Sequence, residues 1–167
     1  MSIRKSAALA AVGLWLGLAG SALAAPWKVQ PGVGIGPVHL GSDTKVADAN
    51  FTREETIQDV GVVTWVKYKE GLELHMDRGK ILQVIVHSPA LAGKSGSFEI
   101  EGDGGVKVGS TVQQMEQALG KNYVARDMHE NIRKGEPMVT YYAYTTKGVG
   151  FEVRAGKIFQ IAIWPKK

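Results

Sequence analysis

Apolar and polar residues alternate along six short stretches of the chain, and each stretch predicts a half-buried β-strand. In one of them Leu72, Leu74 and Met76 are separated by polar residues. Glycine-containing turns join neighbouring stretches, which is typical of β-hairpins. The pattern therefore predicts two three-stranded antiparallel meanders. Their strands cover residues 62–68, 72–77 and 80–87 in the first meander, and 139–144, 149–154 and 157–164 in the second.

A helical periodicity precedes each meander. In the later helix Met115 and Leu119 fall on one face, and Gly120 ends the helix. Ala47 and Phe51 hold the corresponding places in the earlier helix. We expect both helices to pack these apolar residues against a sheet.

The order of helix and meander occurs twice, and individual residues recur with it. Gly41-Ser42 returns as Gly109-Ser110, an offset of 68 residues, and Gly79-Lys80 returns as Gly156-Lys157, an offset of 77. A repeat of this length indicates a duplicated structural unit. The nine additional residues of the second copy fall within 121–137, which we predict to be a long loop or an extra helical turn.

One short helix over three strands buries little apolar surface, so the two copies are expected to share a core. We predict a single α+β domain over residues 25–167, built of two tandem helix-plus-three-strand repeats at about 27–89 and 95–167. Their strands form one antiparallel sheet with the helices on one face, and the other face is open to solvent.

The alternation also assigns residues to the open face. If Leu82 and Val84 point toward the helices, Ile81 and Gln83 point outward, and the same phase in the second copy turns Ile158 outward. Aromatic residues among charged ones on an exposed face are typical of protein-binding surfaces. A second copy or the N-terminal segment remains an alternative cover for this face. The candidate partner-binding residues are Trp65, Glu73, His75, His87, Tyr142, Tyr144, Glu152, Arg154 and Trp164.

No catalytic motif accompanies these residues, and we expect no cofactor. Glu73, His75 and His87 are of metal-ligating types, but the chain has no HExxH motif, and we predict no metal site. The sequence thus favours a non-enzymatic binding module whose partner is a protein. A small-molecule or glycan binder, or a hydrolase that uses Glu73 and Glu152, stays open as the alternative, because paired carboxylates serve glycoside hydrolysis.

Residues 1–24 have the features of an export signal, which predicts a periplasmic or secreted protein. Arg4 and Lys5 precede an apolar run, and Ala22 and Ala24 supply the small residues of a cleavage site. The chain has no Cys, so neither a lipid-modified cysteine nor disulfides are available, and we expect no stable membrane anchor. The 20 basic and 16 acidic side chains are too balanced to favour nucleic acid. We expect a monomer or a weak dimer.

The segments before the two helices, Leu40-Gly41-Ser42-Asp43 and Val108-Gly109-Ser110-Thr111, together with the meanders that follow, resemble the repeat unit of two groups of secreted proteins. These are the SmpA/BamE-type outer-membrane assembly lipoproteins and the beta-lactamase inhibitory proteins. The resemblance implies a two-layer α+β fold and binding of a protein partner, such as a cell-envelope enzyme or an assembly factor, through the sheet face. The lipid-attachment cysteine and the disulfides of those groups have no counterpart here.

Overall fold

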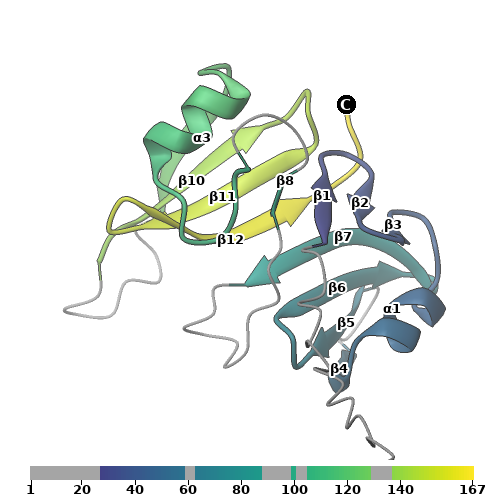
Figure 1. The fold of residues 1–167 in the computed structure, drawn as a ribbon. Coiled ribbons are helices and arrows are strands. Elements are labelled where there is room, and N and C mark those ends of the chain that lie inside the picture. The colour runs from purple at the N-terminus through teal and green to yellow at the C-terminus, as the bar shows by residue number, and fades with distance from the viewer. Residues whose placement is uncertain (1–26, 59–62, 88–98, 101–104, 129–136) are drawn as a thin grey trace, which may run out of the picture.

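The computed structural model describes residues 27–58, 63–87, 99–100, 105–128 and 137–167 (Figure 1). The predicted export signal and segment 88–98, where the first predicted repeat ends and the second begins, lie outside these residues. Strands account for 53% of the described chain and helices for 12%. The prediction of an α+β fold with three strands in each repeat is therefore wrong, and the fold is mostly β.

Eight strands form one antiparallel sheet, in the order β4-β5-β6-β7-β12-β11-β10-β9 (Figure 1). The two repeats meet where β7 pairs with β12, with Val86 opposite Ile161. Each repeat thus supplies four consecutive strands, and the strand order of the second half mirrors that of the first. The strands are β4 (Arg53–Gln58), β5 (Val63–Tyr68), β6 (Leu72–Asp77), β7 (Lys80–His87), β9 (Val124–Met128), β10 (Val139–Tyr144), β11 (Val149–Arg154) and β12 (Lys157–Ile163).

The two strands of the large sheet that the sequence pattern missed, β4 and β9, form the edges of this sheet. Strand β9 lies within 121–137, so the prediction of a loop or an extra helical turn is wrong over residues 124–128. All five residues of β9 are exposed, and residues 53–56 of β4 are exposed as well. A strand that is covered on neither face shows no apolar–polar alternation, and that alternation is the signal on which the prediction depended.

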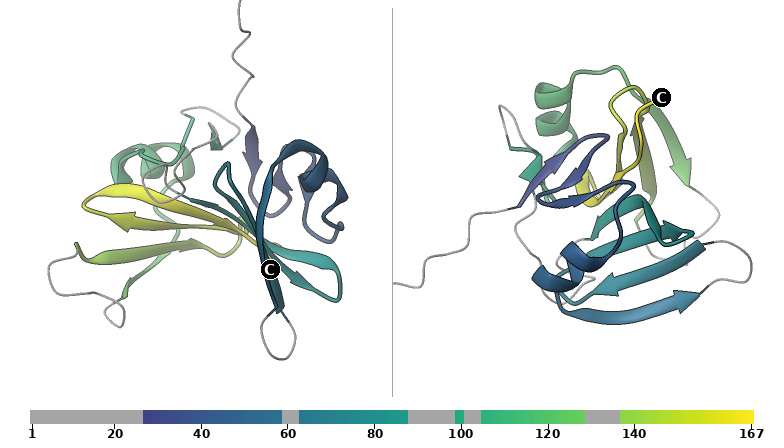
Figure 2. Two further views of the ribbon diagram at one scale, coloured as in Figure 1. Left: turned by 90° about the horizontal axis from the view of Figure 1, so that it is seen from below. Right: turned by 90° about the vertical axis from the view of Figure 1, so that its right-hand side faces the viewer.

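A second, smaller sheet and two short helices lie together on one side of the large sheet (Figure 2). The small sheet has the order β3-β2-β1-β8. The helices have six and eight residues. The helices are too short to cover one face of the eight-stranded sheet alone, and the small sheet covers part of that face. Because strands contribute to both layers, strand dominates the fold. The bounds are β1 (Lys28–Gln30), β2 (Gly34–Ile35), β3 (Val38–His39), β8 (Glu99–Ile100), α1 (Lys45–Asn50) and α3 (Val112–Leu119).

The core lies between the large sheet and these covering elements. Ala47 and Met115 of the helices are fully buried, as predicted, and Phe51 and Leu119 pack against the core as partly buried residues. The small sheet adds further apolar side chains to this core. Fully buried side chains of the two sheets include Val29, Ile35, Val38, Leu74, Val84, Phe151 and Ile161.

One tyrosine in each repeat ties a helical region to the sheet. The hydroxyl of Tyr68 donates to Asp48 Oδ1 of α1 at 2.8 Å. The hydroxyl of Tyr144 donates to the carbonyl oxygen of Gly120, the residue that follows α3, at 2.6 Å. Because both rings are buried, these hydrogen bonds satisfy hydroxyl groups that would otherwise destabilise the core.

Candidate functional site

The face of the large sheet turned away from the helices and the small sheet is the candidate site, and we call it the open face. Among the described elements outside the large sheet, both helices and the small sheet lie on the opposite side (Figure 2). Strand register assigns its residues. In the central strands the open face includes Trp65, Lys67, Glu73, His75, Asp77, Gln83, Ile85, His87, Tyr141, Ala143, Gly150, Glu152, Arg154, Gln160, Ala162 and Trp164.

Seven of the nine predicted partner-binding residues lie on the open face, and Tyr142 and Tyr144 do not. Tyr144 is fully buried in the core, and Tyr142 packs against the core, with its ring centroid 5.0 Å from that of Tyr123. Tyr141, which is not among the predicted partner-binding residues, takes the outward place because it pairs with Glu152.

The error has a simple origin in turn length. Three residues separate Tyr68 from Leu72, whereas four separate Tyr144 from Val149. Equivalent residues of the two repeats are therefore 76 positions apart before the turn and 77 positions apart after it. Use of the offset 77 for β10 moves its assignment by one residue, and a shift of one residue transfers every side chain of a strand to the other face. Alignment of the two buried tyrosines, Tyr68 and Tyr144, would have identified Tyr141 from the sequence.

Two β-bulges also change which residues point outward. The register of β6 with β7 shifts between His75 and Met76, and that of β11 with β12 shifts between Glu152 and Val153. Ile81 and Ile158, predicted to point outward, are consequently buried, and Leu82, predicted to point inward, is 43% exposed. A bulge adds one residue to one strand of a pair and so reverses the alternation on one side of it.

A buried carboxylate that is hydrogen-bonded to two histidines forms a polar cluster on the open face. Glu73 is only 6% exposed. His75 Nε2 lies 2.7 Å from Glu73 Oε1, and His87 Nε2 lies 3.0 Å from Glu73 Oε2. The ring of Trp65 stacks on His75 with 4.7 Å between centroids. Strands β5, β6 and β7 thus bring together four residues that the sequence had selected separately.

The two histidines determine the charge state of Glu73. Burial by itself raises the pKa of this carboxyl, but the hydrogen bonds from His75 and His87 and the charges of both rings outweigh burial and lower the pKa to about 2. Glu73 is therefore ionised at neutral pH. Its two oxygens are already engaged, so it serves as a fixed anion that orients both imidazole rings.

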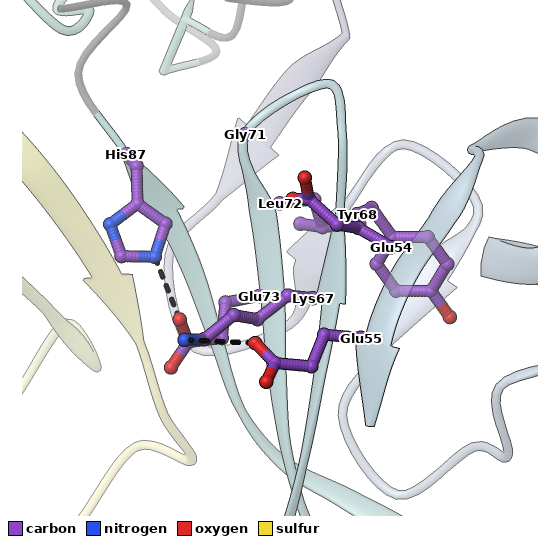
Figure 3. A pocket seen from close by; sticks show the side chains of 8 residues that line it. All are labelled: Glu54, Glu55, Lys67, Tyr68, Gly71, Leu72, Glu73 and His87. Atoms are coloured by element: carbon purple, nitrogen blue, oxygen red, sulfur yellow. Dashed lines mark hydrogen bonds and ion pairs between the residues drawn. The ribbon is translucent and has the colours of Figure 1, made fainter. Parts of the chain in front are cut away.

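A cavity of about 450 Å³ lies next to this cluster (Figure 3). Lys67 Nζ lies 3.6 Å from Glu55 Oε2 at the side of the cavity, and Glu73 and His87 form another part of its wall. Among the described residues, no group of His, Asp and Glu has the arrangement of a metal site. The cavity is suited to a polar or charged group. Its lining residues are Glu54, Glu55, Lys67, Tyr68, Gly71, Leu72, Glu73 and His87.

The second repeat replaces the carboxylate of Glu73 with aromatic cover. Gly150 stands at the equivalent position, and a Cβ added there would lie 2.5 Å from Tyr141 Oη and 2.6 Å from Trp164 Cη2. Glycine therefore allows both rings to lie directly over the backbone of β11. Burial and the nearby charge of Glu152 raise the pKa of Tyr141 to about 12, so its hydroxyl remains a donor at neutral pH.

Glu152 differs from Glu73 in the direction of its pKa shift and in its position in the sheet. Burial raises its pKa, and the nearby charges of Arg154 and His87 only partly oppose that rise. The strands that carry Glu73 and Glu152 are three positions apart, which corresponds to about 14 Å between backbones at about 4.8 Å per strand. Carboxyl pairs of glycosidases stand roughly 5–10 Å apart.

Comparisons with family models, with characterised proteins and with solved structures find no match to this chain. The likeness to the SmpA/BamE-type lipoproteins and the beta-lactamase inhibitory proteins is thus a prediction from the sequence. No helix among the described residues is long and apolar enough to cross a membrane.

Proposed function

We propose that this protein is an exported, non-enzymatic binding module that holds a protein partner with its open face. The observation that carries the proposal is the placement of Trp65, Tyr141 and Trp164 among charged side chains on a broad sheet surface. Aromatic residues and arginine are the side chains that most often dominate the free energy of protein interfaces. The predicted export signal favours a partner in the cell envelope, such as an enzyme or an assembly factor.

The two halves of the open face offer different chemistry to such a partner. The first repeat contributes the fixed Glu73–His75–His87 cluster, and the second contributes Tyr141 and Trp164 over Gly150. Rigid aromatic rings supply contact area at little cost in side-chain entropy, while an oriented polar cluster favours a partner with matching hydrogen-bonding groups.

The alternative of a hydrolase that uses Glu73 and Glu152 has less support. The strand order separates the backbones that carry Glu73 and Glu152 by about 14 Å, which is wider than the spacing of glycosidase carboxyl pairs. A small-molecule or glycan ligand would be expected in the cavity beside Glu73 rather than across the sheet.

Affinity capture from a cell-envelope extract tests the proposal. The unaltered protein is expected to capture a defined partner, and Tyr141→Ala and Trp164→Ala are each expected to reduce that capture at least tenfold, as truncation of an interface anchor does. Val46→Ala is the matched control, because Val46 is exposed on α1, on the opposite side of the sheet. Equal capture by all four proteins would contradict binding through the open face.

A further inference from the structure

The two edges of the large sheet differ in how well they are protected. At the β4 edge the register with β5 is interrupted between Arg53 and Glu55, and Arg53 is held by Asp48 with 2.6 Å between Nη2 and Oδ2. Bulges and charged side chains discourage further strands from joining such an edge. Strand β9 pairs with β10 in unbroken register over all five residues, from Val124 to Met128.

Strand β9 is exposed along its whole length. Val124 is 51% exposed and Met128 is 39% exposed, and register places both on the open-face side together with Arg126. The structure shows no ion pair for Arg126 with any described residue, and no described strand pairs with the outer side of β9. An edge of this kind presents a row of unpaired backbone N–H and C=O groups. An additional β-strand is the ligand best suited to form hydrogen bonds with them.

A second copy of the same strand is a poor occupant of this edge. If β9 of one copy paired antiparallel with β9 of another, with Val124 opposite Met128, Arg126 would lie opposite Arg126. If the register shifted by two residues toward the C-terminus, Asp127 would lie opposite Asp127. Like charges directly opposite each other destabilise a strand pair. The opposite shift would pair only residues 124–126.

We propose that β9 accepts an extended segment of another protein as a ninth strand of the large sheet. The segment would carry an acidic residue opposite Arg126, with an apolar residue at the alternate position on each side, facing Val124 and Met128. The acidic residue would supply the counter-charge that Arg126 lacks among the described residues, and backbone pairing would supply the remaining contacts. Strand addition at β9 requires neither Trp65 nor Trp164, so it is independent of the proposed function of the open face.

A synthetic peptide provides the test. Fluorescently labelled acetyl-Thr-Val-Thr-Glu-Thr-Val-Thr-amide presents the required pattern in either chain direction, and a matched peptide carries Lys in place of Glu. The unaltered protein is expected to prefer the Glu peptide roughly fivefold in fluorescence anisotropy, the size of a cross-strand charge pair. Arg126→Glu is expected to reverse that preference, and a peptide N-methylated at every residue is expected not to bind.

Two controls make the outcome decisive. Lys147→Glu makes the same charge reversal in an exposed turn and is expected to keep the preference for the Glu peptide. Circular dichroism checks that both variants are folded. Absence of peptide binding, or a preference that Arg126→Glu leaves unchanged, would overturn the proposal. A stable dimer in sedimentation that Arg126→Glu alters would also overturn it, because a second copy would then occupy the edge.

Discussion

The ionised Glu73 should stabilise the folded protein in a way that depends on pH. The pKa of this carboxyl falls from 4.5 in the unfolded chain to about 2 in the folded one, which corresponds to about 3 kcal/mol. Because the folded pKa is the lower one, this stabilisation is complete above about pH 4.5 and is lost as the pH falls toward 2. Substitution Glu73→Gln removes the titrating group and keeps its size.

Urea unfolding of the unaltered protein and of Glu73→Gln, measured from pH 5.5 to pH 2, tests this expectation. All other carboxyls titrate in both proteins, so the difference between the two free energies of unfolding isolates Glu73. That difference is expected to shrink by about 3 kcal/mol across the range. His75→Ala and His87→Ala should each reduce the shrinkage, because each removes one hydrogen bond to the carboxylate. A difference that stays constant with pH would refute the reasoning.

Three further predictions concern the core and the aromatic cover. Phe151→Ala should lower the free energy of unfolding by about 3–5 kcal/mol. Because β7 pairs with β12, both repeats should still unfold in a single thermal transition, and two transitions in calorimetry would contradict this. Tyr144→Phe should cost about 1 kcal/mol in urea unfolding by removing the hydrogen bond to Gly120, and an unchanged midpoint would count against that bond. Gly150→Ala should displace the Trp164 ring and change tryptophan fluorescence, whereas an unchanged spectrum would place the ring elsewhere.

The local pattern of the sequence was sufficient to predict strands that are buried on at least one face. Residues 72–77 and 149–154 alternate in polarity, and the structure confirms them as β6 and β11 with the same bounds. The glycine-containing turns between the predicted strands were confirmed as well, because a tight reversal requires particular residue types. Burial imposes its period on the residues themselves, so these elements can be recognised without knowledge of their neighbours.

The fold class and the edge strands could not be predicted in this way. Strands β4 and β9 are defined by pairing with β5 and β10, and their exposed side chains leave no periodic signal. The small sheet consists of segments of two or three residues, too short to show a period. These elements raise the strand content and make the protein mostly β, although both predicted helices are present.

In the candidate site, too, the sequence determines some features and the tertiary structure determines others. The sequence alone determined that Glu73 and His75 share one face of β6, since alternation within one strand requires it. Only the tertiary structure decided that both imidazole rings contact one carboxylate, and that Tyr141 rather than Tyr142 faces outward. Alternation is a property of one strand, whereas register, bulges and turn length depend on how neighbouring strands pair.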